Sequence, residues 1–69
     1  MATSLMEIFS VEIGDILYLN DNLYTVVDWD YADDDEFDVL LTLVDDEGNR
    51  KELRGPIHKE VNLVVTEYV

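Results

Sequence analysis

The sequence VEIGDILYLNDNLYTVVDWDY, residues 11–31, contains two runs of β-branched and aromatic residues on either side of an Asn-Asp-Asn segment at residues 20–22. Such runs favour extended strands, and Asn and Asp between them favour a tight turn. We therefore predict a long β-hairpin over this stretch. The apolar positions change parity at Gly14 and Asp15, which predicts a bend in which Asp15 has a structural role.

Residues 37–44 form the best-patterned of the predicted strands. Their odd-numbered side chains are apolar, whereas Asp and Thr interrupt the even-numbered face. Alternation of this kind is typical of a strand with one buried face. We therefore expect the core to contain Phe37, Val39, Leu41 and Leu43.

The remaining residues predict a turn and two shorter strands. Residues 45–49 (DDEGN) form the turn, with Gly48 in the left-handed conformation. Residues 50–54 return as a charged strand, which suits a sheet edge because charged side chains hinder pairing with other molecules. After a break at residues 55–58, a last strand over residues 61–65 is expected to point Val61, Leu63 and Val65 inward.

Size and composition indicate one small globular domain. The chain has 69 residues, of which 48% are hydrophobic, and its formal net charge is -13. This apolar content is too high for a disordered acidic tail. The absence of Cys excludes disulfides and thiolate metal sites. No apolar run is long enough to cross a bilayer, and residues 1–10 lack the basic start of a signal peptide, so we expect a cytoplasmic protein.

The charge is concentrated in the first part of the chain. Residues 1–49 contain 14 of the 17 acidic residues and neither Lys nor Arg, whereas residues 50–69 contain all four basic residues. Direct contact with nucleic acid needs clustered Lys and Arg, as does binding to an anionic membrane. We therefore expect no direct nucleic-acid partner and no membrane partner.

Five predicted strands without a long helix favour an all-β fold, a single partly open barrel. The chain resembles the SH3-like barrels, in particular their Tudor-like and KOW-like branch, over about residues 11–65. The resemblance rests on the segments IGDI (residues 13–16), YTVV (residues 24–27), LTLV with its DDEG turn (residues 41–48) and PIHKEV (residues 56–61). It implies a short 3₁₀ turn before the last strand. Residues 1–10 show no clear period, so a short helical turn, an added edge strand or a frayed lead-in is open for them; we favour an N-terminal arm that packs Ile8 or Phe9 onto the barrel rim. Residues 66–69 are expected to form a short tail.

The strongest chemical feature is an acidic sector of seven carboxylates within eleven residues. It consists of Asp28, Asp30, Asp33, Asp34, Asp35, Glu36 and Asp38. A solvated loop that keeps the protein soluble is one interpretation. The other, which we favour, is a surface that attracts a basic partner, because so many like charges oppose the compaction of a small domain. On one strand face, Asp28 and Asp30 would lie about 6.7 Å apart and could imitate a nucleic-acid backbone.

Trp29 and Tyr31 alternate with these carboxylates and could form an aromatic cluster together. Filling the core of so small a domain is the interpretation that we favour for them. The resemblance to Tudor-like barrels implies an alternative, a cage in which the rings and a neighbouring Asp bind methylated Lys or Arg.

We identify no catalytic residue, no metal site and no cofactor in the sequence. The acidic runs at residues 33–35 and 45–47 do not match a calcium-binding loop. His58 has neither a Cys nor a second His to complete a zinc site or a nucleophilic relay, so we expect it to be a surface or connector residue.

Three functional hypotheses follow. The first is a non-enzymatic protein whose acidic hairpin and loop bind a basic protein, as an inhibitor or nucleic-acid mimic of the viral or mobile-element type. The second is a Tudor-like reader of cationic or methylated peptide tails. The third is an accessory structural domain with an acidic surface adapted to high salt. A homodimer is a further alternative. Leu40, Val44 and Val64 do not share the parity of the core residues, so they could form an apolar patch on the surface.

Overall fold

The computed structural model describes residues 2–32 and 35–65. In these residues the chain is all-β, with one single-turn 3₁₀ helix, η1. In chain order the elements are β1 (Thr3–Glu7), η1 (Ile8–Ser10), β2 (Ile16–Leu19), β3 (Asn22–Ala32), β4 (Asp35–Val44), β5 (Arg50–Pro56) and β6 (Glu60–Val64). The described residues include no helix with the length and apolar character needed to cross a membrane.

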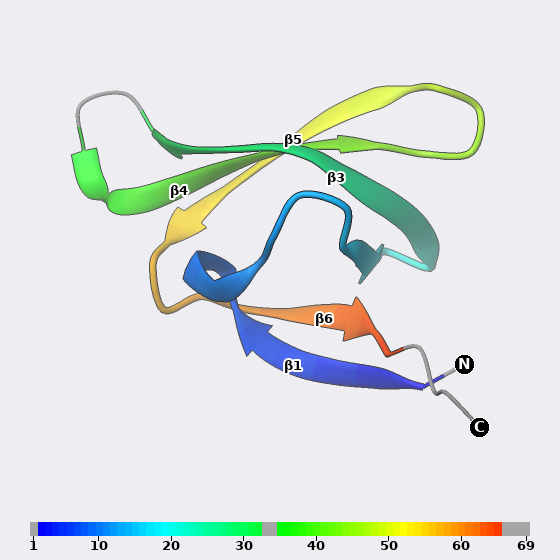
Figure 1. Ribbon diagram of the computed structural model, residues 1–69, viewed down its shortest axis with the longest axis horizontal. Helices are drawn as coiled ribbons and strands as arrows, with labels where there is room; N and C mark the ends of the chain where they lie inside the picture. The colour runs from blue at the N-terminus through cyan, green and yellow to red at the C-terminus, as the bar shows by residue number, and fades with distance from the viewer. Residues whose placement is uncertain (1, 33–34, 66–69) are drawn as a thin grey trace.

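The six strands form one open antiparallel sheet in the order β1-β6-β2-β3-β4-β5. The sheet bends strongly, so that β3, β4 and β5 lie above β1 and β6 in Figure 1. The prediction of five strands is wrong, because Thr3–Glu7, expected within an N-terminal arm, pairs with β6. All five residues of β1 are exposed, so they carry no apolar alternation from which a strand could be predicted.

The predicted hairpin turn is confirmed. Leu19 pairs with Asn22, and the two residues between them, Asn20 and Asp21, have φ angles of 50° and 64°. Positive φ at both central positions defines a type I′ turn, whose twist matches that of the strands it joins. The turn therefore sets the register of β2 against β3.

The first strand of this hairpin is shorter than predicted, since β2 begins only at Ile16. The residues before it form a turn in which Gly14 has a φ of 100°. Asp15 stabilises this turn, because its Oδ2 accepts a hydrogen bond of 2.8 Å from the backbone N–H of Glu12. The predicted bend and the structural role of Asp15 are confirmed.

The core lies between the two halves of the bent sheet. Its buried residues are Ile8, Val11, Leu17, Val26, Val39, Leu41, Leu43, Val61 and Leu63. The predicted core face of β4 is confirmed except at Phe37, which is 75% exposed. Phe37 precedes the first residue of β4 that pairs with β5, so it extends beyond the core. Val65, also expected to point inward, lies after the end of β6 and is exposed.

Where a short 3₁₀ turn was predicted before the last strand, the chain makes a single turn with an i→i+3 hydrogen bond and no 3₁₀ helix. The connection from β5 to β6 is a tight turn in which the N–H of Lys59 donates to the carbonyl oxygen of Pro56 at 2.8 Å. The 3₁₀ helix is η1 instead. Backbone hydrogen bonds join it to this turn, from Ile8 N–H to Lys59 O at 2.7 Å and from Phe9 N–H to Ile57 O at 3.3 Å.

Candidate functional site

A β-bulge in β3 determines which face each candidate residue occupies. Val26 pairs with Leu43 in the core, and the register then shifts before Asp28 pairs with Thr42. Directly opposed residues of an antiparallel pair share a face, and bulges re-aim the side chains that follow them. The consequence is that β3 changes parity at Val27, in the middle of the strand.

After the bulge, the aromatic and acidic residues of β3 lie on opposite faces. Trp29 pairs with Leu41 and Tyr31 pairs with Val39, both of which are fully buried. The two aromatic side chains therefore lie on the core face of the sheet, and Asp28 and Asp30 lie on its outer face.

One edge of this part of β3 has no strand partner within the described residues. β2 pairs with β3 only as far as Thr25, and Val26 then exchanges backbone hydrogen bonds with Gly14 and Asp15. Beyond that point, among the residues that the structure describes, β3 pairs only with β4, on its other side. We refer to residues 28–31 on this side as the free edge of β3.

Carboxylates cap the backbone amides of the free edge. The N–H of Trp29 donates to Asp28 Oδ1 at 2.9 Å, and the N–H of Tyr31 donates to Asp30 Oδ1 at 2.8 Å. Both hydrogen bonds are exposed to solvent. Each Asp thus turns its side chain back toward the edge, where it occupies a donor that another strand would otherwise use.

The predicted aromatic pair is present and has a third member. The Trp29 ring lies edge to face with Tyr31, with centroids 5.1 Å apart, and edge to face with Phe9, with centroids 5.8 Å apart. Trp29 is half-buried against the core, whereas Phe9 and Tyr31 are exposed. The buried Trp29 Nε1 has no hydrogen-bond partner among the described residues. Trp29 therefore contributes to the core, as we favoured, whereas the same prediction is wrong for Tyr31, which is exposed and, with Phe9, extends the cluster to the surface.

The structure describes four of the seven side chains of the predicted acidic sector. Asp28, Asp30 and Glu36 are exposed. Asp38 differs from them, because its Oδ2 lies 3.2 Å from Arg54 Nε in an ion pair across β4 and β5. Asp33 and Asp34 lie outside the described residues, as does the side chain of Asp35.

Three of the four basic residues lie on the far side of β4 from this acidic edge. β5 carries Arg50, Lys51 and Arg54, and β4 separates it from β3. Besides the Arg54 ion pair, Lys51 places its Nζ 5.8 Å from the ring centroid of Tyr24. The sheet is therefore acidic at β3 and basic at β5.

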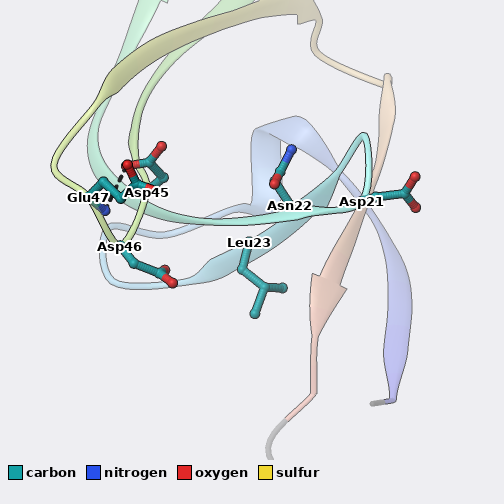
Figure 2. Close-up of a pocket in the computed structure, with 6 residues that line it drawn as sticks. All are labelled: Asp21, Asn22, Leu23, Asp45, Asp46 and Glu47. Atoms are coloured by element: carbon teal, nitrogen blue, oxygen red, sulfur yellow. Dashed lines mark hydrogen bonds between the residues drawn. The ribbon is translucent and has the colours of Figure 1, made fainter.

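A second acidic group forms where two turns meet, which sequence reasoning did not predict. The turn between β2 and β3 and the turn between β4 and β5 line a cavity of about 250 Å³. Figure 2 shows Leu23 in the middle, with acidic side chains of the second turn on one side and Asp21 and Asn22 on the other. The lining residues of the second turn are Asp45, Asp46 and Glu47.

The side chain of Asp45 accepts hydrogen bonds within its own turn. Its Oδ1 accepts hydrogen bonds of 2.9 Å from the N–H groups of Asn49 and Glu47, and its Oδ2 accepts one of 3.1 Å from Asn49 Nδ2. These bonds, chiefly those from Asn49, lower the pKa of Asp45 below its ordinary value. The predicted left-handed conformation of Gly48 in this turn is confirmed, with a φ of 84°.

Within residues 2–32 and 35–65, no three His, Cys, Asp or Glu side chains are grouped so that they could hold a metal ion. His58 lies in the connection before β6, and its Nδ1 is 2.9 Å from Glu7 Oε2. Both side chains are exposed, so His58 is the surface connector residue that we predicted.

No protein-family model matches the sequence, and no curated protein is similar enough to match it. Among solved structures, the fold is similar to that of a translation initiation factor eIF-5A family protein from Naegleria fowleri, with a TM-score of 0.73. The sequence identity is 14%, and the match covers 88% of this chain and 46% of the other. The likeness supports a small all-β fold, and this chain spans less than half of that protein's length.

Proposed function

We propose that this protein is a non-enzymatic, cytoplasmic interaction protein whose acidic sector binds a basic surface of another protein. The observation that carries the proposal is the position of Asp28 and Asp30, whose exposed carboxylates lie at an edge that no strand pairs with in residues 2–32 and 35–65. The first 49 residues contain neither Lys nor Arg.

Electrostatics gives this proposal its physical basis. Carboxylates of one sign on one side of a molecule attract a cationic partner from a distance and raise the rate of association. Along β3, side chains on one face repeat about every 6.7 Å, so Asp28 and Asp30 present a spaced row of negative charge. A row of this kind supports the more specific proposal that the protein imitates a nucleic-acid backbone and inhibits a nucleic-acid-binding protein.

We further infer that the fold is an SH3-like barrel of the Tudor-like or KOW-like branch. The strand order, the strong bend of the sheet and the backbone hydrogen bonds between η1 and the turn before β6 support this inference. The similarity to the eIF-5A family structure agrees with a small β-barrel. It carries no functional conclusion, because one fold supports many unrelated functions.

Binding of a short oligolysine peptide tests the proposed function. The variant Asp28→Asn/Asp30→Asn removes two charges and keeps an oxygen that can cap each edge amide. The control Glu52→Gln/Glu60→Gln removes two exposed charges from β5 and β6. We expect the first variant to bind several-fold more weakly than the control, and binding to weaken as salt rises to about 0.3 M. Equal affinity of the two variants, or no binding, would reject the proposal.

The aromatic cluster of Phe9, Trp29 and Tyr31 supports a second candidate function, the binding of methylated Lys or Arg. Phe9 and Tyr31 expose their rings beside Trp29, and such rings attract a cation through cation–π interaction, although Asp28 and Asp30 lie on the opposite face of β3. Titration with methylated-Lys and unmethylated peptides, followed at the Trp29 indole resonance, tests it. A preference for the methylated peptide supports this function. If neither peptide binds and molar KCl markedly raises the stability, an acidic accessory domain adapted to high salt is the better account.

A further inference from the structure

We propose that the free edge of β3 binds an extended segment of the basic partner as an added strand. Lys or Arg side chains of that segment would take the carboxylates of Asp28 and Asp30 away from the backbone amides that they cap. This inference rests on the proposed function and specifies the form of the partner: an extended basic peptide segment instead of any basic surface.

The free edge has the donors that strand addition requires. The amides of Trp29 and Tyr31 both face the edge, because each donates to a capping carboxylate instead of to β4. Two such donors on one strand lie about 6.7 Å apart, which is the spacing of alternate carbonyl groups in an extended peptide. Both caps are solvent-exposed side-chain bonds, so they can be exchanged without breaking any pairing between strands.

The caps make this edge selective for a basic strand. When a peptide carbonyl replaces a cap, the carboxylate of Asp28 or Asp30 loses its donor and needs another. A Lys or Arg side chain on the incoming strand supplies one with a charge-assisted hydrogen bond. A neutral strand supplies none, and it would leave the two carboxylates unpaired beside it.

The same charges disfavour a second copy of the chain at this edge. If two free edges paired with each other, the acidic side chains of the two copies would lie on adjacent strands. Like charges on adjacent strands are destabilising. The occupant that fits the free edge is therefore a basic segment of a different molecule.

The two faces of β3 predict the residue pattern of that segment. Residues of the added strand beside Asp28 and Asp30 would lie on the outer face, where a basic side chain fits. Residues beside Trp29 and Tyr31 would lie on the face of the aromatic cluster, where Phe9 and Tyr31 are exposed and an apolar side chain fits. The preferred segment alternates basic and apolar residues.

Two short peptides of equal composition test the inference. One alternates Lys and Val, and the other has its Lys and Val in two separate blocks. We expect the alternating peptide to bind at least about tenfold more tightly. Only this peptide can form the edge hydrogen bonds and at the same time place all its Lys side chains on the outer face and all its Val side chains on the face of the aromatic cluster. In NMR spectra, the amides of Trp29 and Tyr31 should shift and become protected from hydrogen exchange.

Methylation of the peptide amides provides a control that changes no charge. In an added strand only alternate amides face β3, so N-methylation of one alternate set should abolish binding and methylation of the other set should not. Equal, salt-sensitive affinity of the alternating and block peptides would overturn strand addition and leave the proposed function standing. No binding of either peptide would overturn both proposals. Pairing between two copies at this edge would overturn the inference alone.

Discussion

The carboxylate of Asp30 accepts a hydrogen bond of 2.8 Å from the backbone N–H of Tyr31, the residue that follows it in β3. Asp28 caps Trp29 in the same way at 2.9 Å. These two bonds satisfy the exposed amides of an edge that no strand covers in the part of the chain that the structure describes. Natural sheets often carry charges at such edges to prevent pairing between molecules. The two Asp residues therefore both protect the edge and supply its negative charge.

Removal of both caps should increase self-association. We expect Asp28→Ala/Asp30→Ala to shift the sedimentation profile toward dimers or larger species at a given concentration, because two unpaired edge amides and less repulsion favour edge pairing. Asp28→Asn/Asp30→Asn is the matched control, since it removes the same charge and retains capping oxygens. Equal association of the two variants would mean that charge alone protects the edge.

A side chain at Gly55 should force the side chain of Lys59 to move. Gly55 is buried on β5, and a Cβ at this position would overlap Cδ of the Lys59 side chain that lies across it. We expect Gly55→Ala to lower the free energy of unfolding by about 1–3 kcal/mol. In the double variant Gly55→Ala/Lys59→Ala most of that loss should be recovered. Additive effects in this double-mutant cycle, measured by denaturant unfolding, would contradict the proposed packing.

Substitution by Ala should lower the free energy of unfolding much more at Leu41 than at Phe37, although both are apolar residues of the same parity in β4. Leu41 is fully buried, so Leu41→Ala should cost about 2–5 kcal/mol of unfolding free energy. Phe37 is 75% exposed, and Phe37→Ala should cost less than about 1 kcal/mol. Chemical denaturation of both variants under the same conditions measures the difference. A larger loss for Phe37→Ala would show that it is packed in solution.

The turn at Asp45 should lose stability in acid. Its hydrogen bonds hold the pKa of Asp45 below the ordinary value, so the ionised carboxylate stabilises the fold above the unfolded-state pKa. This contribution is lost as the pH falls through the lower, folded-state pKa. Asp45→Asn should therefore be less stable than the wild type at pH 7, and the difference should shrink below about pH 4.

Asp46→Asn is the control for this pH dependence. It removes an equal charge from the next residue of the same turn, so it reports the relief of charge repulsion alone. Thermal unfolding of both variants at neutral and acidic pH separates the two effects. A destabilisation by Asp45→Asn that stays constant with pH would contradict the role assigned to the ionised carboxylate.

Local sequence signals predicted the parts of the fold that depend on neighbouring residues. The turn at Asn20 and Asp21 and the left-handed Gly48 follow from residue types that tolerate positive φ. The buried alternation of Val39, Leu41 and Leu43 follows from their period of two. In each case one short segment contains all the information that the prediction needs.

Features that depend on distant contacts could not be predicted. β1 carries no burial pattern, because backbone pairing with β6 holds it in place and its side chains are exposed. The bulge at Val27 lies among residues that are apolar on both parities, so the face of Trp29 was undetermined. Phe9 joins the aromatic cluster only because η1 is held against the turn before β6. Of the candidate site, the residue types were predictable and their arrangement was not.

The proposed function depends on the binding of a basic partner at the acidic edge of β3. Chemical-shift mapping of the protein during titration with an oligolysine peptide tests it most directly, because several other exposed carboxylates compete for the same peptide. We predict that the largest shifts fall on residues 28–31 and on Glu36. Shifts of equal size around Glu12, Glu47 and Glu60, or shifts confined to the cavity at Asp45, would contradict the claim.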